Sequence, residues 1–190
     1  RVLFRSNRAA CNAVEMLERI NSWGLVHSGK IRIKTEQINA NDLIKDIMQG
    51  MPIIEEKSIT VHCRTRGKGI FTVDRNILET ILRNLLSNAA KFSPYNGKIT
   101  ILMAGNESSC FFLVGDNGIG IPAQKIESIF SYDRQYRQTG TAGETGTGLG
   151  LLICRELTES HASTIKVKSR AEMRSAFLFT LKTDVHTRSS

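Results

Sequence analysis

Two asparagines and a lysine recur at helical spacing near the middle of the chain. Residues 74–92 have the apolar periodicity of a helix, and Asn84, Asn88 and Lys91 fall on one face of it. An amide oxygen is a hard ligand suited to Mg²⁺, which keeps several of its waters. A lysine can meet a phosphate as a point charge. A solvated polar face is the alternative for this stripe taken alone.

A strand-like run ends in the sequence VGDNGIGIP, residues 114–122. Gly118 and Gly120 allow the backbone to turn tightly and to approach a ligand closely. Asp116 at the strand end needs a hydrogen-bond donor if it is buried, and the exocyclic amine of adenine is one such donor. A plain hairpin turn is the alternative.

Four glycines crowd into residues 143–150, directly before an apolar helical run. Glycine costs a helix about 1 kcal/mol relative to alanine, so their position needs a reason. Gly146, Gly148 and Gly150 leave bare backbone amides at a helix N-terminus, where the helix dipole favours an anion such as phosphate. The spacing matches neither the G-x-G-x-x-G of dinucleotide folds nor the lysine-containing phosphate loop.

The elements that must position these motifs mix helices with pairs of strands. A strict strand–helix alternation is absent, so we expect an α+β fold. It would be a two-layer sandwich, with helices on one face of a mixed, mostly antiparallel sheet, preceded by a long N-terminal helix. The predicted strands are residues 31–38, 58–64, 70–73, 98–104, 110–115, 164–169 and 175–182, and the predicted helices are residues 2–27, 41–48, 74–92, 123–130 and 148–160.

Local signals set the ends of several elements. Helix 74–92 is expected to pack on the sheet through an apolar stripe of Leu78, Leu82, Leu85 and Ala89. Gly50 and Pro52 are expected to end the helix before them. A Gly-Lys-Gly turn is expected to separate the two strands of residues 58–73.

Composition is that of an ordinary globular protein, with 41% hydrophobic and 23% charged residues. The net charge of +8 is spread over both ends of the chain and aromatic residues make up only 6%, which argues against a nucleic-acid partner. The four cysteines are too far apart for metal-ligand spacing. No apolar run reaches the roughly 20 residues of a membrane span. We expect a cytoplasmic, reducing location, with any membrane anchor outside this chain.

Taken together, the motifs resemble the signature boxes of sensor histidine kinases. NLLSNAAKFS from Asn84 resembles the N box, DNGIGIP from Asp116 the first glycine box, the surroundings of Phe130 the F box, and TGTGLGLLICREL the second glycine box. The order and spacing match from about residue 31 to residue 182. The wider superfamily, with its Bergerat or GHKL fold, includes type II topoisomerases, MutL mismatch-repair proteins and heat-shock 90 chaperones.

The resemblance implies an ATP site with Mg²⁺. Asn88 would coordinate the metal, and Lys91 would approach a phosphate. Asp116 would accept from the adenine amine, with Thr180 beside it. Catalysis would rest on Asn84, Asn88 and Lys91. The residues implied to bind ATP are Asn84, Asn88, Lys91, Asp116, Gly118, Gly120, Ile121, Gly146, Thr147, Gly148, Leu149, Gly150 and Thr180.

The residue type at position 84 indicates which nucleophile attacks ATP. Relatives that hydrolyse ATP with water carry a glutamate at this position, and an amide has no useful basicity with which to activate water. The resemblance therefore implies transfer of the γ-phosphoryl group to a histidine, with magnesium and the lysine stabilising charge. A nucleotide-binding sensor or scaffold module without phosphotransfer, and a water-using ATPase of the same superfamily, are the alternatives.

The resemblance divides the chain into three parts. Residues 1–29 resemble the last helix of a dimerisation and phosphoacceptor domain, residues 30–184 the catalytic domain, and residues 185–190 a tail. The implied partners are ATP, the phosphoacceptor helical domain of the same protein, a response regulator and, through the N-terminal helix, a second copy in a homodimer. Docking of that helix on its own domain is the alternative. None of His27, His62, His161 and His186 has the context of a phosphoacceptor.

Two turns depart from the family pattern. His161 is not followed by the usual pair of glycines, and residues 171–176 lack the usual glycine-rich turn. We expect both turns to lie far from the nucleotide. The resemblance also implies that residues 131–147 form a lid over ATP and that Phe130 seats this lid.

Overall fold

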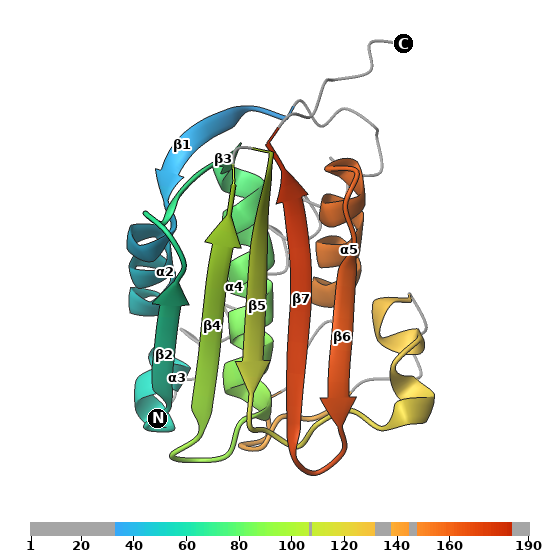
Figure 1. Ribbon diagram of the computed structural model, residues 1–190. Coiled ribbons are helices and arrows are strands. Elements are labelled where there is room, and N and C mark those ends of the chain that lie inside the picture. Colours follow the sequence, from blue (N-terminus) through green and yellow to red (C-terminus); the bar gives the residue numbers. More distant parts are fainter. Residues whose placement is uncertain (1–32, 107, 132–137, 145–147, 184–190) are drawn as a thin grey trace, which may run out of the picture. The chain divides into compact units, whose positions relative to one another are not determined.

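A computed structural model of the chain describes residues 33–106, 108–131, 138–144 and 148–183. Its main sheet carries α2 (Ala40–Gln49), α4 (Arg75–Phe92) and α5 (Gly150–Ser160) on one face, so the fold has two layers (Figure 1). The predicted two-layer α+β sandwich is confirmed. The predicted N-terminal helix and tail lie outside the described residues.

The main sheet has five strands in the order β2-β4-β5-β7-β6. The first pair, β2 and β4, is parallel, and the other neighbours are antiparallel. A mixed, mostly antiparallel sheet was predicted, and this is confirmed. The strands are β2 (Thr60–Thr65), β4 (Lys98–Gly105), β5 (Ser109–Asp116), β6 (Ile165–Arg170) and β7 (Arg174–Lys182).

The core lies between the three central strands and the helices. Buried and half-exposed side chains alternate along β4, β5 and β7, as expected for strands with one face packed. Phe112 and Phe179 are fully buried on the helix side, and their rings stack with centroids 5.0 Å apart. This side of the sheet supports α4 and α5.

The central helix α4 follows the predicted pattern. Oδ1 of Asp74 accepts a hydrogen bond from the backbone N–H of Ile77 at 3.1 Å, which caps the helix N-terminus. Leu78, Leu82 and Leu85 are fully buried. The apolar stripe therefore packs inward, as predicted.

The two strands beside the Gly-Lys-Gly turn do not pair with each other. β3 (Ile70–Asp74) pairs with β1 (Thr35–Asn39) in a separate two-stranded sheet, whereas β2 joins the main sheet beside β4. Gly67 and Gly69 have φ angles of +88° and +72°, which glycine adopts freely. The glycines allow the chain to turn, but long-range pairing decides the partners.

The helix before Gly50 and Pro52 ends there as predicted, since α2 stops at Gln49 and Gly50 is its C-cap. Pro52 also begins a short helix that was not predicted, α3 (Pro52–Glu56), because a missing N–H costs nothing in a first helical turn. The helix predicted at residues 123–130 is instead two short 3₁₀ turns, Ala123–Lys125 and Ser128–Phe130.

Across the described ranges, no helix is long and apolar enough to cross a membrane.

Candidate functional site

The N-terminus of α5 packs on the asparagine face of α4. Asn84 is only 8% exposed, and its Nδ2 donates to the carbonyl of Thr80 at 2.9 Å. Its Oδ1 lies beside Gly150, where an added Cβ would stand only 2.7 Å from that oxygen. Asn88 follows one turn later and is half-buried. The first and third predicted motifs are therefore in contact.

Lys91 extends the same face toward the segment predicted to be the lid. Its Nζ donates to the carbonyl of Gln138 at 3.3 Å and lies 4.8 Å from the ring centroid of Phe92. The ring of Phe130 meets that of Phe177 in β7 edge-on, with centroids 6.4 Å apart. Its predicted role in seating the lid stays a prediction.

Asp116 ends β5 and is 9% exposed. Burial raises the pKa of its carboxyl to about 6, although hydrogen bonds from the amides of Gly118 and Ser175 act to lower it. The bond from Gly118 reaches Oδ1 at 2.9 Å. A buried carboxylate gains from any further donor, so this group is suited to bind a ligand N–H.

Gly118 and Gly120 let the first glycine box fit between two neighbours. A side chain at Gly118 would clash with the carbonyl of Phe92 in α4. One at Gly120, whose φ is +67°, would clash with the carbonyl of Arg170. Ile121 continues the loop and donates its N–H to Oγ of Ser169 at 2.8 Å. The glycines are required for close backbone approach.

The turn near residues 171–176, which was expected to lie far from the nucleotide, contacts the loop of the first glycine box. The N–H of Glu172 donates to the carbonyl of Ile119 at 2.6 Å. Because β5 and β7 are antiparallel, the turn before β7 lies beside the loop after β5. Its altered sequence therefore bears on the shape of the first glycine box. The departure at His161 is different, since this residue caps the far end of α5.

Thr180 does not lie beside Asp116, which corrects the sequence-based expectation. Thr180 pairs with Phe111, whereas the strand partner of Asp116 is Ser175. Five positions separate Ser175 from Thr180, and an odd separation places side chains on opposite faces of a strand. Ser175, 6% exposed, is the residue that sequence reasoning missed, because nothing local specifies the register of β5 against β7.

The second glycine box leads directly into α5. Gly148 has a φ of +76°, and Leu149 occupies the N-cap of a helix that begins at Gly150. Leucine has no side-chain acceptor for the first-turn amides, which suits a helix end that receives an anion. Gly146 and Thr147 lie outside the described residues, so their role stays a prediction.

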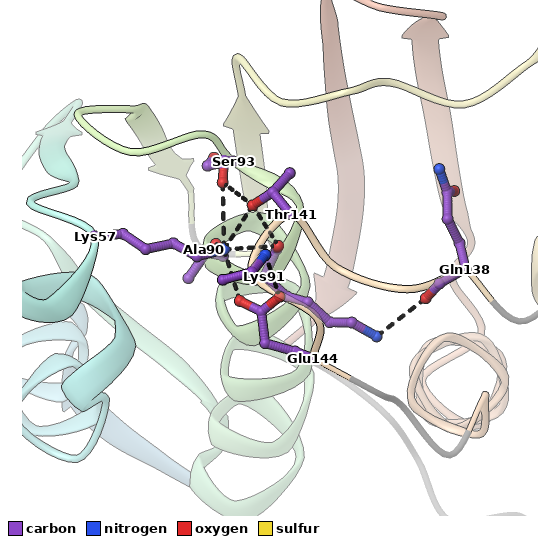
Figure 2. Close-up of polar contacts among 8 residues, drawn as sticks. Lys57, Ala90, Lys91, Ser93, Gln138, Thr141 and Glu144 are labelled. Carbon is purple, nitrogen blue, oxygen red and sulfur yellow. Dashed lines mark hydrogen bonds and ion pairs between the residues drawn. The ribbon is translucent and has the colours of Figure 1, made fainter.

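The C-terminus of α4 accepts hydrogen bonds from Lys57, from the segment 138–144 and from the first glycine box. Its last four carbonyls have no partners within the helix ladder, and each is satisfied from another residue, in part as drawn in Figure 2. The N–H of Ser93 donates to Ala89, Nζ of Lys57 to Ala90 and Lys91, the N–H of Thr141 to Lys91, and the N–H of Ile119 to Phe92. Sequence reasoning missed Lys57 and Thr141, since neither lies in a recognisable motif.

Residues 73–185, more than half of the chain, match the family described as histidine kinase-, DNA gyrase B-, and HSP90-like ATPase. The chain belongs to this family of ATP-binding domains. The geometry agrees, because α4 brings the predicted N box and both glycine boxes together.

Sensor proteins are among the similar sequences. SrrB of Staphylococcus aureus is 33% identical over 122 residues, which are 63% of this chain and 20% of SrrB. The sensor histidine kinase TmoS of Ectopseudomonas mendocina is 32% identical over 161 residues, which are 82% of this chain and 16% of TmoS. The chain thus spans about a fifth or less of the length of these relatives.

Solved histidine kinases have the same fold. The catalytic domain of histidine kinase ThkA is 29% identical with a TM-score of 0.66, over 79% of this chain and 96% of that domain. ThkA in complex with the response regulator protein TrrA is 25% identical with a TM-score of 0.66, over 92% of this chain and 49% of that one. Acinetobacter baumannii histidine kinase AdeS, 18% identical with a TM-score of 0.75 over 97% of this chain and 86% of that one, shares the fold.

Proposed function

We propose that this chain is the catalytic part of a two-component sensor histidine kinase. It binds Mg-ATP and transfers the γ-phosphoryl group to a histidine on a helical dimerisation domain. The observation that carries the proposal is the packing of Asn84 against Gly150. The side chain that α4 presents to the start of α5 in this contact is an amide and not a carboxylate, which supports phosphotransfer over activation of water.

Adenine recognition is assigned to Asp116. Its carboxylate accepts the exocyclic amine, and Gly118, which has no side chain, lets the loop pack against the carbonyl of Phe92 and the carboxylate itself. Burial strengthens this hydrogen bond because water competes poorly there. The same carboxylate would disfavour a guanine carbonyl at that place, so the site prefers ATP to GTP.

The amide face of α4 fits a magnesium ion. Asn84 and Asn88 offer hard amide oxygens one turn apart, and the bond to Thr80 fixes which way the amide of Asn84 points. The described part of the chain holds no cluster of three His, Cys, Asp or Glu residues as an alternative metal site. When bound, the ion would neutralise charge on the ATP phosphates.

Lys91 supplies a second positive charge at the phosphate end. Its ammonium group would exchange the carbonyl of Gln138 for a phosphate oxygen. Asn84 does not act as a base, so water is not activated and the incoming histidine nitrogen serves as nucleophile.

The proposal includes further partners and a location. A response regulator would receive the phosphoryl group, which the ThkA–TrrA complex supports by likeness. A homodimer would form through the helical domain. A cytoplasmic location is supported by Cys63, Cys110 and Cys154, all free thiols.

A phosphotransfer assay tests the proposal. The chain is incubated with Mg²⁺, ATP labelled at the γ-phosphate, and isolated phosphoacceptor domains of sensor kinases. We expect acid-labile label on the acceptor. Asp116→Asn should lose at least about tenfold in ATP affinity while its circular dichroism stays native. ATP binding without transfer to any acceptor would indicate a sensor or scaffold module, and rapid acceptor-free phosphate release would indicate an ATPase.

A further inference from the structure

Lys57 is a buried cation far in sequence from every predicted motif. It caps the C-terminus of α3 and is only 1% exposed. A buried ammonium group is costly unless several acceptors surround it. Nζ of Lys57 lies 3.1 Å from the carbonyl of Ala90, 2.9 Å from that of Lys91, 3.3 Å from that of Ser93, 2.7 Å from Oγ1 of Thr141 and 2.6 Å from Oε1 of Glu144.

These partners come from two parts of the molecule. The carbonyls belong to the C-terminal end of α4, whose negative dipole end favours a cation. Thr141 and Glu144 belong to the segment 138–144, and Glu144 is the carboxylate that pairs with Lys57 in the described structure. Figure 2 shows Lys57 between the helix end and this segment. The ammonium group therefore links the two parts.

The segment itself is a closed turn. The N–H of Gly140 donates to the carbonyl of Glu144 at 2.9 Å, and Oε2 of Glu144 accepts from the N–H of Ala142 at 2.8 Å. Gly143 has a φ of +81°. A Cβ on Gly140 would clash with both Glu144 and Lys91. The turn therefore packs closely against the side chain of Lys91, which is predicted to contact a phosphate.

Glu144 is ionised at neutral pH. Partial burial acts to raise the pKa of its carboxyl, but hydrogen bonds from Lys57 and from backbone amides outweigh it and lower the pKa below its ordinary value. The ionised carboxylate of Glu144 faces Nζ of Lys57 at a place largely shielded from water, where charge-assisted contacts are strong.

We propose that Lys57 is a positioning residue for the nucleotide phosphates. Through Glu144 and Thr141 it holds the chain that enters the second glycine box against the end of α4. Gly148 follows Glu144 by four residues, which span at most about 14 Å, so the ion pair limits where the phosphate loop can lie. This inference rests on the proposed ATP site and adds a residue remote from it in sequence.

Glu144→Gln is the decisive variant, because it removes the charge and leaves the cap that Lys57 provides to α4. Glu159→Gln is the matched control, since Glu159 forms an exposed ion pair with Arg155. Titration calorimetry compares a non-hydrolysable ATP analogue with adenosine, and hydrogen exchange follows the amides of Thr141 and Gly143. Thermal unfolding checks that each variant is folded.

We expect Glu144→Gln to bind the ATP analogue about tenfold more weakly, with adenosine affinity unchanged and faster exchange at Thr141 and Gly143. A smaller loss in the same direction is expected for Thr141→Val. Equal analogue affinity in the wild-type chain and Glu144→Gln, or an equal loss for adenosine, overturns the inference alone. A wild-type chain that binds neither ligand overturns the proposed function as well.

Discussion

Asp116 shows how one residue type, placed at one strand end, sets a requirement on the ligand. Its carboxyl is buried on the helix side of the sheet, and burial raises the pKa to about 6. The residue was identifiable in the sequence because the acid follows an apolar strand and precedes two glycines, in a motif that resembles the first glycine box. Its strand partner Ser175 was not, because register is a long-range property.

Adenosine binding should depend on pH through Asp116. A donor from adenine favours the ionised carboxyl, so binding lowers its pKa below that of the free chain. Affinity then rises with pH up to about 6 and levels off above it. We expect affinity at pH 5 to be about tenfold below that at pH 7.5, measured by titration calorimetry. Adenosine is chosen because it has no phosphate to titrate.

Asp116→Asn provides the control for that experiment. Its remaining affinity for adenosine should be independent of pH between 5 and 7.5, because no group at the base then titrates. If the wild-type chain binds adenosine equally well at pH 5 and pH 7.5, Asp116 does not recognise the base in its ionised form.

At the scale of elements, α4 organises the site. Its apolar stripe, its cap at Asp74 and its polar face were all predictable, because each follows from residue type and helical period. The partners at its C-terminus were not predictable. Lys57 reaches Ala90 across 33 positions of sequence, and no local pattern marks a lysine that will be buried.

The cap of α4 should be important for stability. Asp74 is 6% exposed and accepts from the N–H of Ile77 at 3.1 Å and of Lys34 at 2.8 Å. Asp74→Ala removes both bonds and should lower the free energy of unfolding by about 1–2 kcal/mol, measured by urea denaturation. The exposed Asp42, 4.0 Å from Lys45, provides the control, and Asp42→Ala should change stability by less than about 0.5 kcal/mol. Equal effects would show that Asp74 is no cap.

At the scale of the whole molecule, the two-layer arrangement could be predicted from the sequence, but the pairing of the strands could not. The mixed order of helices and strand pairs, without a strict strand–helix alternation, predicted helices on one face of a mixed sheet. The partners of β2 and β3 could not be predicted, because a flexible turn permits several pairings and distant strands select one. The same reason explains Thr180 and the turn near residues 171–176, whose places depend on β7 lying beside β5.

A two-layer fold with one helix touching both glycine boxes implies a single ligand site. Nuclear magnetic resonance of the labelled chain, titrated with Mg²⁺ and a non-hydrolysable ATP analogue, tests this directly. We predict that the amide signals of Asn88, Gly118 and Gly148 shift together at one saturating concentration, while those of Leu102 and Leu178 on the other face of the sheet stay in place. Shifts confined to one of the three motifs, or to the other face of the sheet, would contradict the account.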